Sequence, residues 1–341
     1  MDKKRTFVLQ FIFGIAILAL IIWYFGAENY FEVLSRTNLF WLLIACIPFA
    51  IVQLNISYQF YRLYRKSGFK LAFIDSLMIT CWGSFIGMIN QAALILFKIE
   101  ALHKASGVDR LTCVNRFGFL HSIGSLLTVI GAFLGLWTIG SFIDPSVAVY
   151  LQAFAVILLT CAVGFILLIV PSTPLLGFKN AVLKRLPSFL RNALGKVVSS
   201  DIPTSKFEAA VIFGLSIVTW ILKSLEWMLI FHAINPEEFP LSNQLFFFCF
   251  SIFFLLDIAR QMPFIPTNIG IYDLVVAAGF SATQLDVRLG LVFAMLTRFT
   301  CVVGSGWAFI QPHYVLKVLS GTTPKTPSKK APFKVKPLIN G

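Results

Sequence analysis

The amino-acid sequence predicts an all-α protein that crosses a membrane several times, and three observations support this fold class. First, 58% of the 341 residues are hydrophobic and only 13% are charged, whereas roughly a quarter of the residues in globular domains are charged. Second, several apolar runs reach the ~20 residues that a helix needs to cross the hydrocarbon core. Third, the basic residues behind the net charge of +13 gather in loops and at the chain ends, as the positive-inside rule describes. This distribution argues against a nucleic-acid-binding protein.

The first half of the chain contains four predicted membrane-spanning helices, at about residues 7–25, 39–58, 113–139 and 147–170. Lys3, Lys4 and Arg5 precede the first of them, so we expect a cytoplasmic N-terminus. The first apolar run is longer than the core of a signal peptide, and Trp23 stands in a bulky stretch where a small-residue cleavage site would be expected. We therefore interpret this run as an uncleaved helix.

Residues 71–97 are apolar but are interrupted by small and polar residues, Asn90 and Gln91 among them. If this segment crossed the membrane, the basic loop predicted at residues 98–116 would lie outside. If it entered and returned, that loop would stay inside. The positive-inside rule favours the re-entrant hairpin, and a full crossing is the alternative.

Another loop is predicted at residues 26–38, between the first two helices.

The second half follows a basic connector, residues 171–206, which we place in the cytoplasm as either an interface-lying amphipathic segment or a solvated linker. Helices are expected at about residues 207–233, 241–259 and 289–310. The Lys- and Pro-rich tail, residues 312–341, is expected to be disordered and cytoplasmic. The predicted membrane domain thus spans residues 1–311 and has seven to nine membrane segments, one or two of them broken or re-entrant. Its halves are about 1–170 and 207–311.

The interrupted segment of the second half carries Pro263, Pro266, Asn268, Gly270 and Asp273 in apolar surroundings. Proline removes a backbone donor, and glycine and asparagine favour non-helical backbone. Broken backbone at membrane depth persists only where it is buried in protein or lines a water-filled cavity. A cytoplasmic tail requires this segment to cross the membrane, whereas its composition also suits a second re-entrant loop. The sequence leaves both possibilities open.

Both halves show the same order of features, which indicates a possible internal repeat. Each has two helices, an interrupted apolar segment, a short polar loop and a helix with an Arg-Phe pair, at Arg116 in the first half and at Arg298 in the second. Paired interrupted segments at corresponding places are the best sequence pointer to a transporter's binding site. Chance similarity between apolar helices is the alternative explanation.

Arg298 lies near the middle of a predicted membrane helix, where an ionisable residue indicates a functional site and needs a partner. A guanidinium can donate two parallel hydrogen bonds to a phosphate, so Arg298, Arg260 and Arg116 are candidate phosphate-binding residues. Arg298 could instead form a structural ion pair with Asp273 or Asp257. Arg116 could simply extend its charged end to the membrane surface.

Lys223 and Glu226 are three residues apart in another predicted membrane helix and therefore share one face. Two ionisable groups that must lie in lipid can neutralise each other as an ion pair, which is the first interpretation of these residues. In the second, Glu226 carries a proton and couples the protein to a proton gradient.

Nothing in the sequence predicts a metal, a cofactor or a known soluble catalytic motif. The six cysteines lie in or beside apolar segments, none forms a Cys-x-x-Cys pair, and no histidine stands at ligand spacing from them. Neither a nucleotide-binding loop nor a hydrolase or metalloprotease motif is present. We therefore expect no cofactor, no ATP-driven step and a transporter rather than an enzyme.

The stretch from Pro263 onward resembles the second signature of the lysylphosphatidylglycerol synthase transmembrane-region family, also called the flippase-like family. Members show a pattern close to Pro-x-x-Pro-Gly-Gly-x-Gly-x-x-Glu, then a short loop and a helix with a central arginine. Here the pattern ends at Asp273 in place of glutamate, and Thr267 and Asn268 replace two of the glycines. Arg298 lies in the expected helix.

The first signature of the family, roughly Pro-x-x-Gly-Glu-x-x-Arg, is weaker in this chain. Lys98 stands for its arginine and Arg116 for the arginine of the following helix, but residues 91–97 contain no proline, glycine or acid. The resemblance implies a stand-alone lipid-handling domain without the aminoacyl-transferase domain, and it adds Lys98 to the candidate phosphate-binding residues.

These observations and the resemblance predict a protein of the bacterial inner membrane that moves an anionic phospholipid or a lipid-linked intermediate across the bilayer. Membrane lipids are therefore the expected partners. The alternative is a membrane-embedded transferase that acts on a polyprenyl or phospholipid carrier. A third interpretation is an accessory subunit of lipid or envelope synthesis that binds a lipid-synthesis enzyme.

Overall fold

The structure is a computed structural model that describes residues 27–139, 206–261, 271–282 and 285–306, with single positions at 19, 23, 149, 153, 156 and 308. Several predicted segments lie outside the described residues. They are most of the first helix (7–25), most of the fourth helix (147–170), the connector (171–205), the proline-rich motif (263–270) and the tail (312–341).

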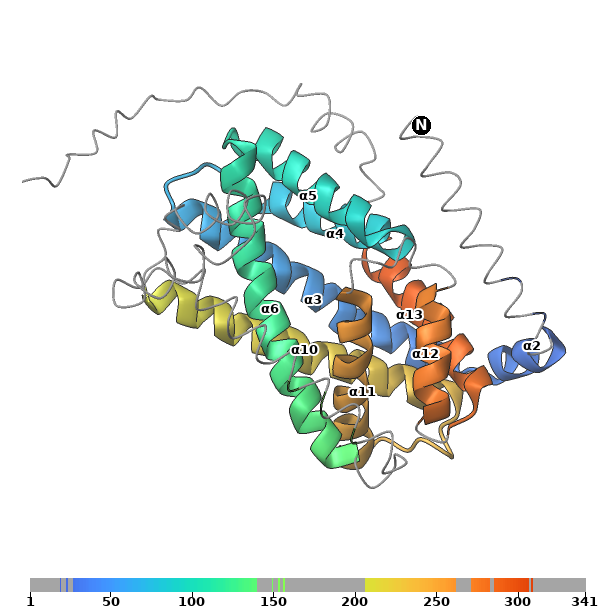
Figure 1. Ribbon diagram of the computed structural model, residues 1–341. Helices are drawn as coiled ribbons and strands as arrows, with labels where there is room; N and C mark the ends of the chain where they lie inside the picture. Colours follow the sequence, from blue (N-terminus) through green and yellow to red (C-terminus); the bar gives the residue numbers. More distant parts are fainter. Residues whose placement is uncertain are drawn as a thin grey trace, which may run out of the picture.

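Every regular element among the described residues is a helix (Figure 1). In chain order these are α2 (Ala27–Arg36), α3 (Leu39–Lys66), α4 (Phe73–Ile89), α5 (Gln91–Ser106), α6 (Arg110–Ile139), α10 (Lys206–Ile234), α11 (Asn243–Gln261), α12 (Ile271–Ala282) and α13 (Val287–Gly304). By length and composition, α3, α10 and α13 can each cross a membrane. The all-α fold class is confirmed, and the total of seven to nine segments stays a prediction.

Two segments that the sequence predicted as loops are helical. Residues 26–38 contain α2. The predicted basic loop at 98–116 is helical as well, because α5 and α6 are separated by residues 107–109 alone. Gly107 adopts the left-handed conformation (φ 70°) that commonly ends a helix.

The loop predictions were wrong because the charged side chains pair along and between helices instead of marking exposed turns. Within α2, Glu32 contacts Arg36 one turn later at 2.5 Å. Within α5, Glu100 contacts Lys104 one turn later at 3.6 Å, and it also contacts Arg110 of α6 at 2.8 Å. Pairs at this spacing support a helix.

The helices α3 and α10 form the axis of the described bundle and run in opposite directions (Figure 1). At one end of the pair, Arg62 donates a hydrogen bond to Glu208 at 2.7 Å. At the other end, the backbone N–H of Asn38 donates to the carbonyl of Ala233 at 2.7 Å. Asn38 also begins α3, since its side chain accepts from two backbone N–H groups of the first turn.

The first interrupted segment folds as a helical hairpin, α4 and α5. Asn90 breaks the helix with extended backbone (φ −152°), and α5 then runs back along α4. A Cβ atom at Gly83 would lie 2.4 Å from the Lys98 side chain, and one at Gly87 would lie 2.5 Å from Leu94. The helices are therefore antiparallel and close, as small residues at a membrane helix interface allow.

The hairpin begins and ends at the same end of the bundle. α4 follows α3 after a short turn and runs back along it, where Ser84 donates a hydrogen bond to Gln53 at 3.0 Å. With 17 residues, α4 is about 26 Å long, whereas the 28 residues of α3 span about 42 Å. The turn at Asn90 therefore lies partway along the bundle. This fold-back is what the re-entrant interpretation requires, and its depth in a membrane stays a prediction.

The helices of the second half pack through an aromatic core. Phe231 of α10 stacks on Phe280 of α12 with parallel rings 5.4 Å apart, and it also contacts Phe293 of α13 at 4.8 Å. Trp227 lies edge-on to Phe293 at 4.8 Å. These contacts hold α12 and α13 against the axis, while α11 packs along α6.

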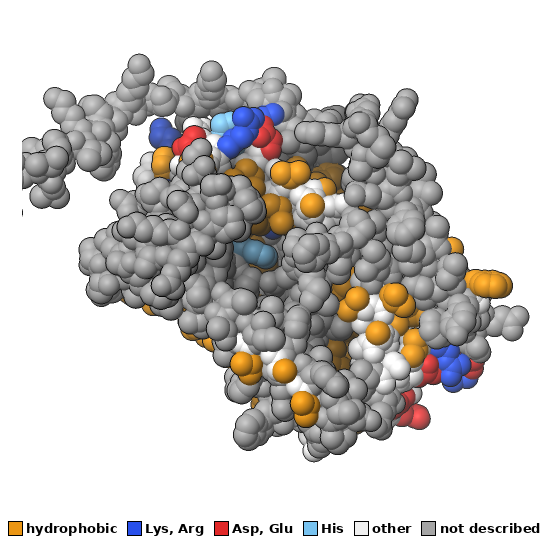
Figure 2. All heavy atoms as spheres, in the orientation of Figure 1, with side chains coloured by type: hydrophobic (Ala, Val, Ile, Leu, Met, Phe, Trp, Pro, Cys, Tyr) orange, Lys and Arg blue, Asp and Glu red, His pale blue; other side chains and the backbone are white. Residues whose placement is uncertain are grey.

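Charged side chains gather at two margins of the face shown in Figure 2. The end of the bundle that contains the α3–α4 turn and the α5–α6 connection carries more base than acid: Arg62, Arg65, Lys66, Lys70, Lys104 and Arg110 beside Asp75, Glu100, Asp109 and Glu208. The end that contains α2 and the α10–α11 connection carries more acid: Glu32, Glu237, Glu238 and Asp286 beside Arg36 and Arg288. The two ends therefore differ in charge.

Candidate functional site

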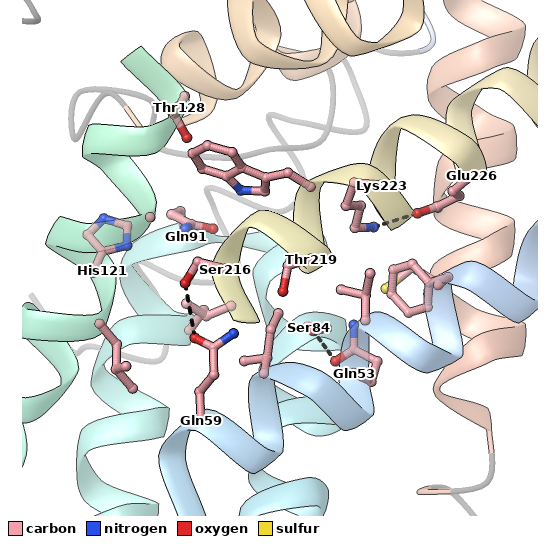
Figure 3. A pocket seen from close by; sticks show the side chains of 18 of the residues that line it. Gln53, Gln59, Ser84, Gln91, His121, Thr128, Ser216, Thr219, Lys223 and Glu226 are labelled. Carbon is pink, nitrogen blue, oxygen red and sulfur yellow. Dashed lines mark hydrogen bonds and ion pairs between the residues drawn. The ribbon is translucent and has the colours of Figure 1, made fainter. Parts of the chain in front are cut away.

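A cavity of about 320 Å³ lies between α3, α4, α5, α6, α10, α12 and α13. Figure 2 shows a hollow on one face of the molecule with a histidine side chain in it. In Figure 3, polar side chains from several of these helices line the cavity. Its volume falls in the range of about 300–1,000 Å³ that is usual for small-molecule sites.

One wall of the cavity carries the ion pair between Arg298 of α13 and Asp273 of α12. Each carboxylate oxygen accepts one guanidinium hydrogen bond, at 2.6 and 2.8 Å. The antiparallel packing of α12 and α13 brings together residues that are 25 positions apart. A two-point contact of this kind fixes the plane of the guanidinium.

A second ion pair lines the cavity from α10. Lys223 Nζ lies 2.7 Å from Glu226 Oε2, and Thr300 of α13 donates to the other oxygen of Glu226 at 2.7 Å. The ammonium group also lies 4.1 Å from the centre of the Phe49 ring of α3, which is a favourable cation–π distance. Three helices thus hold this pair.

Both ion pairs turn their cation toward the cavity. The carboxylate side chains of Asp273 and Glu226 are each 1% exposed, whereas the side chains of Arg298 and Lys223 are 21% and 18% exposed. Both cations line the cavity, and so does Glu226. A molecule in the cavity therefore meets more of the positive than of the negative groups.

Lys98 of α5 is a third cation in the cavity wall. The residue is buried, and its Nζ lies 5.7 Å from the centre of the Phe60 ring of α3. The missing side chain of Gly83 leaves room for the Lys98 stem, since a Cβ there would lie 2.4 Å from Lys98 Cε. The hairpin of α4 and α5 therefore determines where this cation lies.

The N-terminus of α5 also reaches the cavity. Asn90 caps it, because the Asn90 side chain accepts a hydrogen bond from the backbone N–H of Ala93 at 2.9 Å. Gln91, the first residue of α5, lines the cavity. The partial positive charge of a helix N-terminus adds to the field of the three cations.

Neutral amides and hydroxyls make up most of the remaining polar wall (Figure 3). Gln59 is 5% exposed and contacts Ser216 at 3.3 Å through Oε1. Neither Nε2 of Gln59 nor Oε1 of Gln91 has a hydrogen-bond partner among the described residues. Buried polar atoms are normally paired, so these two are unsatisfied polar atoms on residues of the cavity wall.

The structure brings five of the predicted site residues together at the cavity: Arg298, Asp273, Lys223, Glu226 and Lys98. It places Arg298 against Asp273, one of the two partners considered.

The other predicted residues are elsewhere or outside the described part. Arg116 does not line the cavity. It is buried with its guanidinium carbon 4.4 Å from the Phe69 ring centre, so it does not extend to the surface. Arg260 lies within α11, and its side chain is outside the described part. So is the motif Pro263, Pro266, Asn268 and Gly270.

Sequence reasoning missed most of the neutral polar wall. Its signal was present in α10, where Ser216, Thr219, Lys223 and Glu226 follow one another at intervals of three and four residues. That spacing places them on one face of a helix. Gln59 gave no such signal, because only the fold shows that it faces the cavity. Among the described residues there is no group of three side chains that could hold a metal ion.

Comparison with known proteins identifies one family. The family model described as the lysylphosphatidylglycerol synthase TM region matches residues 11–304 of the chain. No curated protein matches the chain, and no solved structure matches it.

Proposed function

The chain is a membrane protein of the lysylphosphatidylglycerol synthase transmembrane-region family, and we propose that its central cavity receives the phosphate-bearing head group of an anionic lipid during transfer across the bilayer. The single observation that carries this proposal is the convergence of Arg298, Lys223 and Lys98 from three helices on one cavity. Cations inside a membrane protein are costly, and they mark substrate or ion pathways.

The arrangement of the two ion pairs supports a phosphate site over a purely structural role. In each pair the carboxylate is almost fully buried and its cation is the more exposed partner. Among the described residues, the cations Arg298, Lys223 and Lys98 line the cavity, and Glu226 is the one carboxylate that lines it with them. The N-terminus of α5 adds to the positive charge of these cations, and half-helix N-termini bind anionic substrate groups in membrane transporters. Asp273 then serves to orient Arg298 for the phosphate.

The size and lining of the cavity suit a head group and leave the acyl chains outside. Its apolar wall includes Phe49, Leu120, Trp220 and Trp227, and the outward faces of the helices carry large exposed hydrophobic side chains such as Phe213 and Ile217. A head group can lie among the polar residues while the chains remain in the membrane.

The difference in charge between the two ends supports an orientation. The positive-inside rule places the basic end, with the α3–α4 turn, in the cytoplasm. We propose that the protein lies in a bacterial inner membrane and that both of its termini are in the cytoplasm. Glu226 is the proposed proton carrier if transfer is coupled to a gradient.

Lipid movement in reconstituted vesicles tests the proposal, with labelled phosphatidylglycerol and a labelled polyprenyl phosphate as probes. The variant Arg298→Gln/Asp273→Asn removes both charges of the pair and leaves the net charge at the cavity unchanged. If Arg298 binds the phosphate, the double variant should move lipid about tenfold or more slowly than wild type, because hydrogen bonds to charged groups are the strongest. If the pair is only structural, the neutral double variant should move lipid normally.

Arg288→Gln is the matched control for this experiment. Arg288 lies on the same helix, and its exposed side chain pairs with Asp286 at 2.6 Å, so its loss should leave the rate unchanged. A wild-type protein that moves no probe lipid would contradict the proposed transfer. It would favour the transferase or the accessory subunit instead.

A further inference from the structure

We infer that the cavity selects a head group rich in hydroxyls, such as a glycerol, inositol or sugar phosphate, and rejects head groups with an amino cation. This inference rests on the proposed function, since it treats the cavity as a head-group site. It adds the chemical class of the substrate, and it is carried by neutral side chains that the phosphate argument does not use.

The first step concerns the carboxylates, which are the groups that would bind an ammonium. Both oxygens of Glu226 accept hydrogen bonds, from Lys223 and from Thr300. Both oxygens of Asp273 accept from Arg298. An amino cation in the cavity would compete for these oxygens and would meet three like charges. The charge distribution therefore disfavours a cationic head group.

The second step concerns Gln59, whose amide has one unsatisfied end. Nε2 has no partner among the described residues, while Oε1 lies 3.3 Å from Ser216 Oγ. If the amide is turned over, Nε2 faces Ser216 and Oε1 becomes the unsatisfied atom. A ligand hydroxyl suits either orientation, because it both donates and accepts a hydrogen bond. A phosphate oxygen suits only one of them.

The third step is that Gln91 offers a second group of this kind. Its Oε1 has no hydrogen-bond partner among the described residues, and if the amide is turned over, Nε2 takes the place of that oxygen. A hydroxyl suits both orientations, whereas an ionised phosphate oxygen can pair only with Nε2. Gln91 stands beside the positive N-terminus of α5, so a group that suits hydroxyls lies next to a site for the phosphate.

The fourth step is the way in which these amides are held. Gln59 lies on α3 and contacts Ser216 of α10. Gln53 lies on the same helix and accepts a hydrogen bond from Ser84 of α4. Figure 3 shows these residues lining the cavity together with Thr219. The polar wall is therefore built from three helices and is preorganised, which favours specific recognition of a ligand.

The test compares lipids that share a phosphate and differ in the rest of the head group. Wild type, Gln59→Leu and Gln91→Leu are reconstituted with labelled phosphatidylinositol, phosphatidylglycerol, phosphatidic acid and lysyl-phosphatidylglycerol. Gln244→Leu on α11 is the matched control, because its side chain is exposed and does not line the cavity. In parallel, thermal unfolding of detergent-solubilised protein is measured with inositol phosphate or inorganic phosphate.

Wild type should move the two hydroxyl-rich lipids fastest and the lysyl lipid slowest. Gln59→Leu and Gln91→Leu should each slow the hydroxyl-rich lipids about fivefold, the value of one neutral hydrogen bond, and leave phosphatidic acid unchanged. A structural role would instead slow all lipids alike. Equal wild-type rates for all anionic lipids, or a fastest rate for the lysyl lipid, would overturn this inference while lipid transfer stands.

The binding measurement separates the two proposals. In one outcome no lipid moves, inositol phosphate stabilises wild type more than inorganic phosphate does, and Gln59→Leu loses this difference. That outcome would support a hydroxyl-rich ligand and contradict lipid transfer. The ligand is then a soluble phosphate. If no lipid moves and the two phosphates act alike, both proposals are wrong.

Discussion

At the scale of single residues, the cavity is held together by two ion pairs whose carboxylates are almost fully buried. A buried pair contributes little net stability, because desolvation offsets the attraction, but removal of one partner leaves an unpaired buried charge. The penalty therefore falls on single substitutions. This asymmetry separates a folding defect from a binding defect, since the neutral double variant avoids the unpaired charge.

The variant Arg298→Gln should lower the free energy of unfolding by about 3–5 kcal/mol, because Asp273 is left charged and buried. Adding Asp273→Asn should restore most of that loss. Arg288→Gln should cost less than about 1 kcal/mol, since its partner is exposed. Thermal unfolding in detergent measures all three. A double variant as unstable as the single one would show that the pair itself stabilises the fold.

At the scale of elements, close approach of helices depends on glycines at contact points. Gly290 of α13 faces α12, where an added Cβ would lie 3.0 Å from the Phe280 ring and 3.1 Å from the backbone of Ala277. The backbone cannot move aside as a flexible side chain can. Because α12 carries Asp273 and α13 carries Arg298, this contact also sets the geometry of the ion pair.

Gly290→Ala should therefore destabilise the protein by about 1–3 kcal/mol through overpacking, and it should slow any lipid transfer as the ion pair shifts. Gly214→Ala in α10 is the control, because nothing lies within 4 Å of its added Cβ. There the better helix propensity of alanine should raise stability by up to about 1 kcal/mol. Equal unfolding temperatures for the two variants would contradict this account of the packing.

At the scale of the whole molecule, the difference in charge between the two ends predicts the orientation in the membrane. The basic end contains Lys70 and the acidic end contains Glu237, and both residues are exposed. Lysine and arginine are retained on the cytoplasmic side during insertion. All described cysteines are buried, so a cysteine introduced at either end should be the one that reacts.

A membrane-impermeant maleimide should label Glu237→Cys in intact cells and should label Lys70→Cys only after the membrane is permeabilised. The unsubstituted chain measures background reaction. Labelling of Lys70→Cys from outside would reverse the proposed orientation, and labelling of both from outside would contradict α3 and α10 as membrane-crossing helices.

Much of the helical framework was predictable, because long apolar runs have few alternatives in a membrane. The helices α3, α6, α10, α11 and α13 lie where the sequence placed spans, and the break at Asn90 coincides with the predicted interruption. The helices over residues 27–36 and 98–106 were missed, because charges that pair along a helix look like loop residues in a sequence. Gln59 could not be identified as a cavity residue, since that depends on how α3 meets α10.

The hairpin of α4 and α5 begins and ends at one end of the bundle, and this has a consequence for how such a chain can diversify. If a membrane-crossing helix is gained or lost, every later helix reverses its orientation in the membrane. The reason is that each crossing changes the number of crossings between odd and even. A hairpin that returns to its starting side contributes an even number of crossings and therefore leaves the parity unchanged. Its length, its tip at Asn90 and the cation it carries at Lys98 can therefore change while α6 and every later helix keep their orientation.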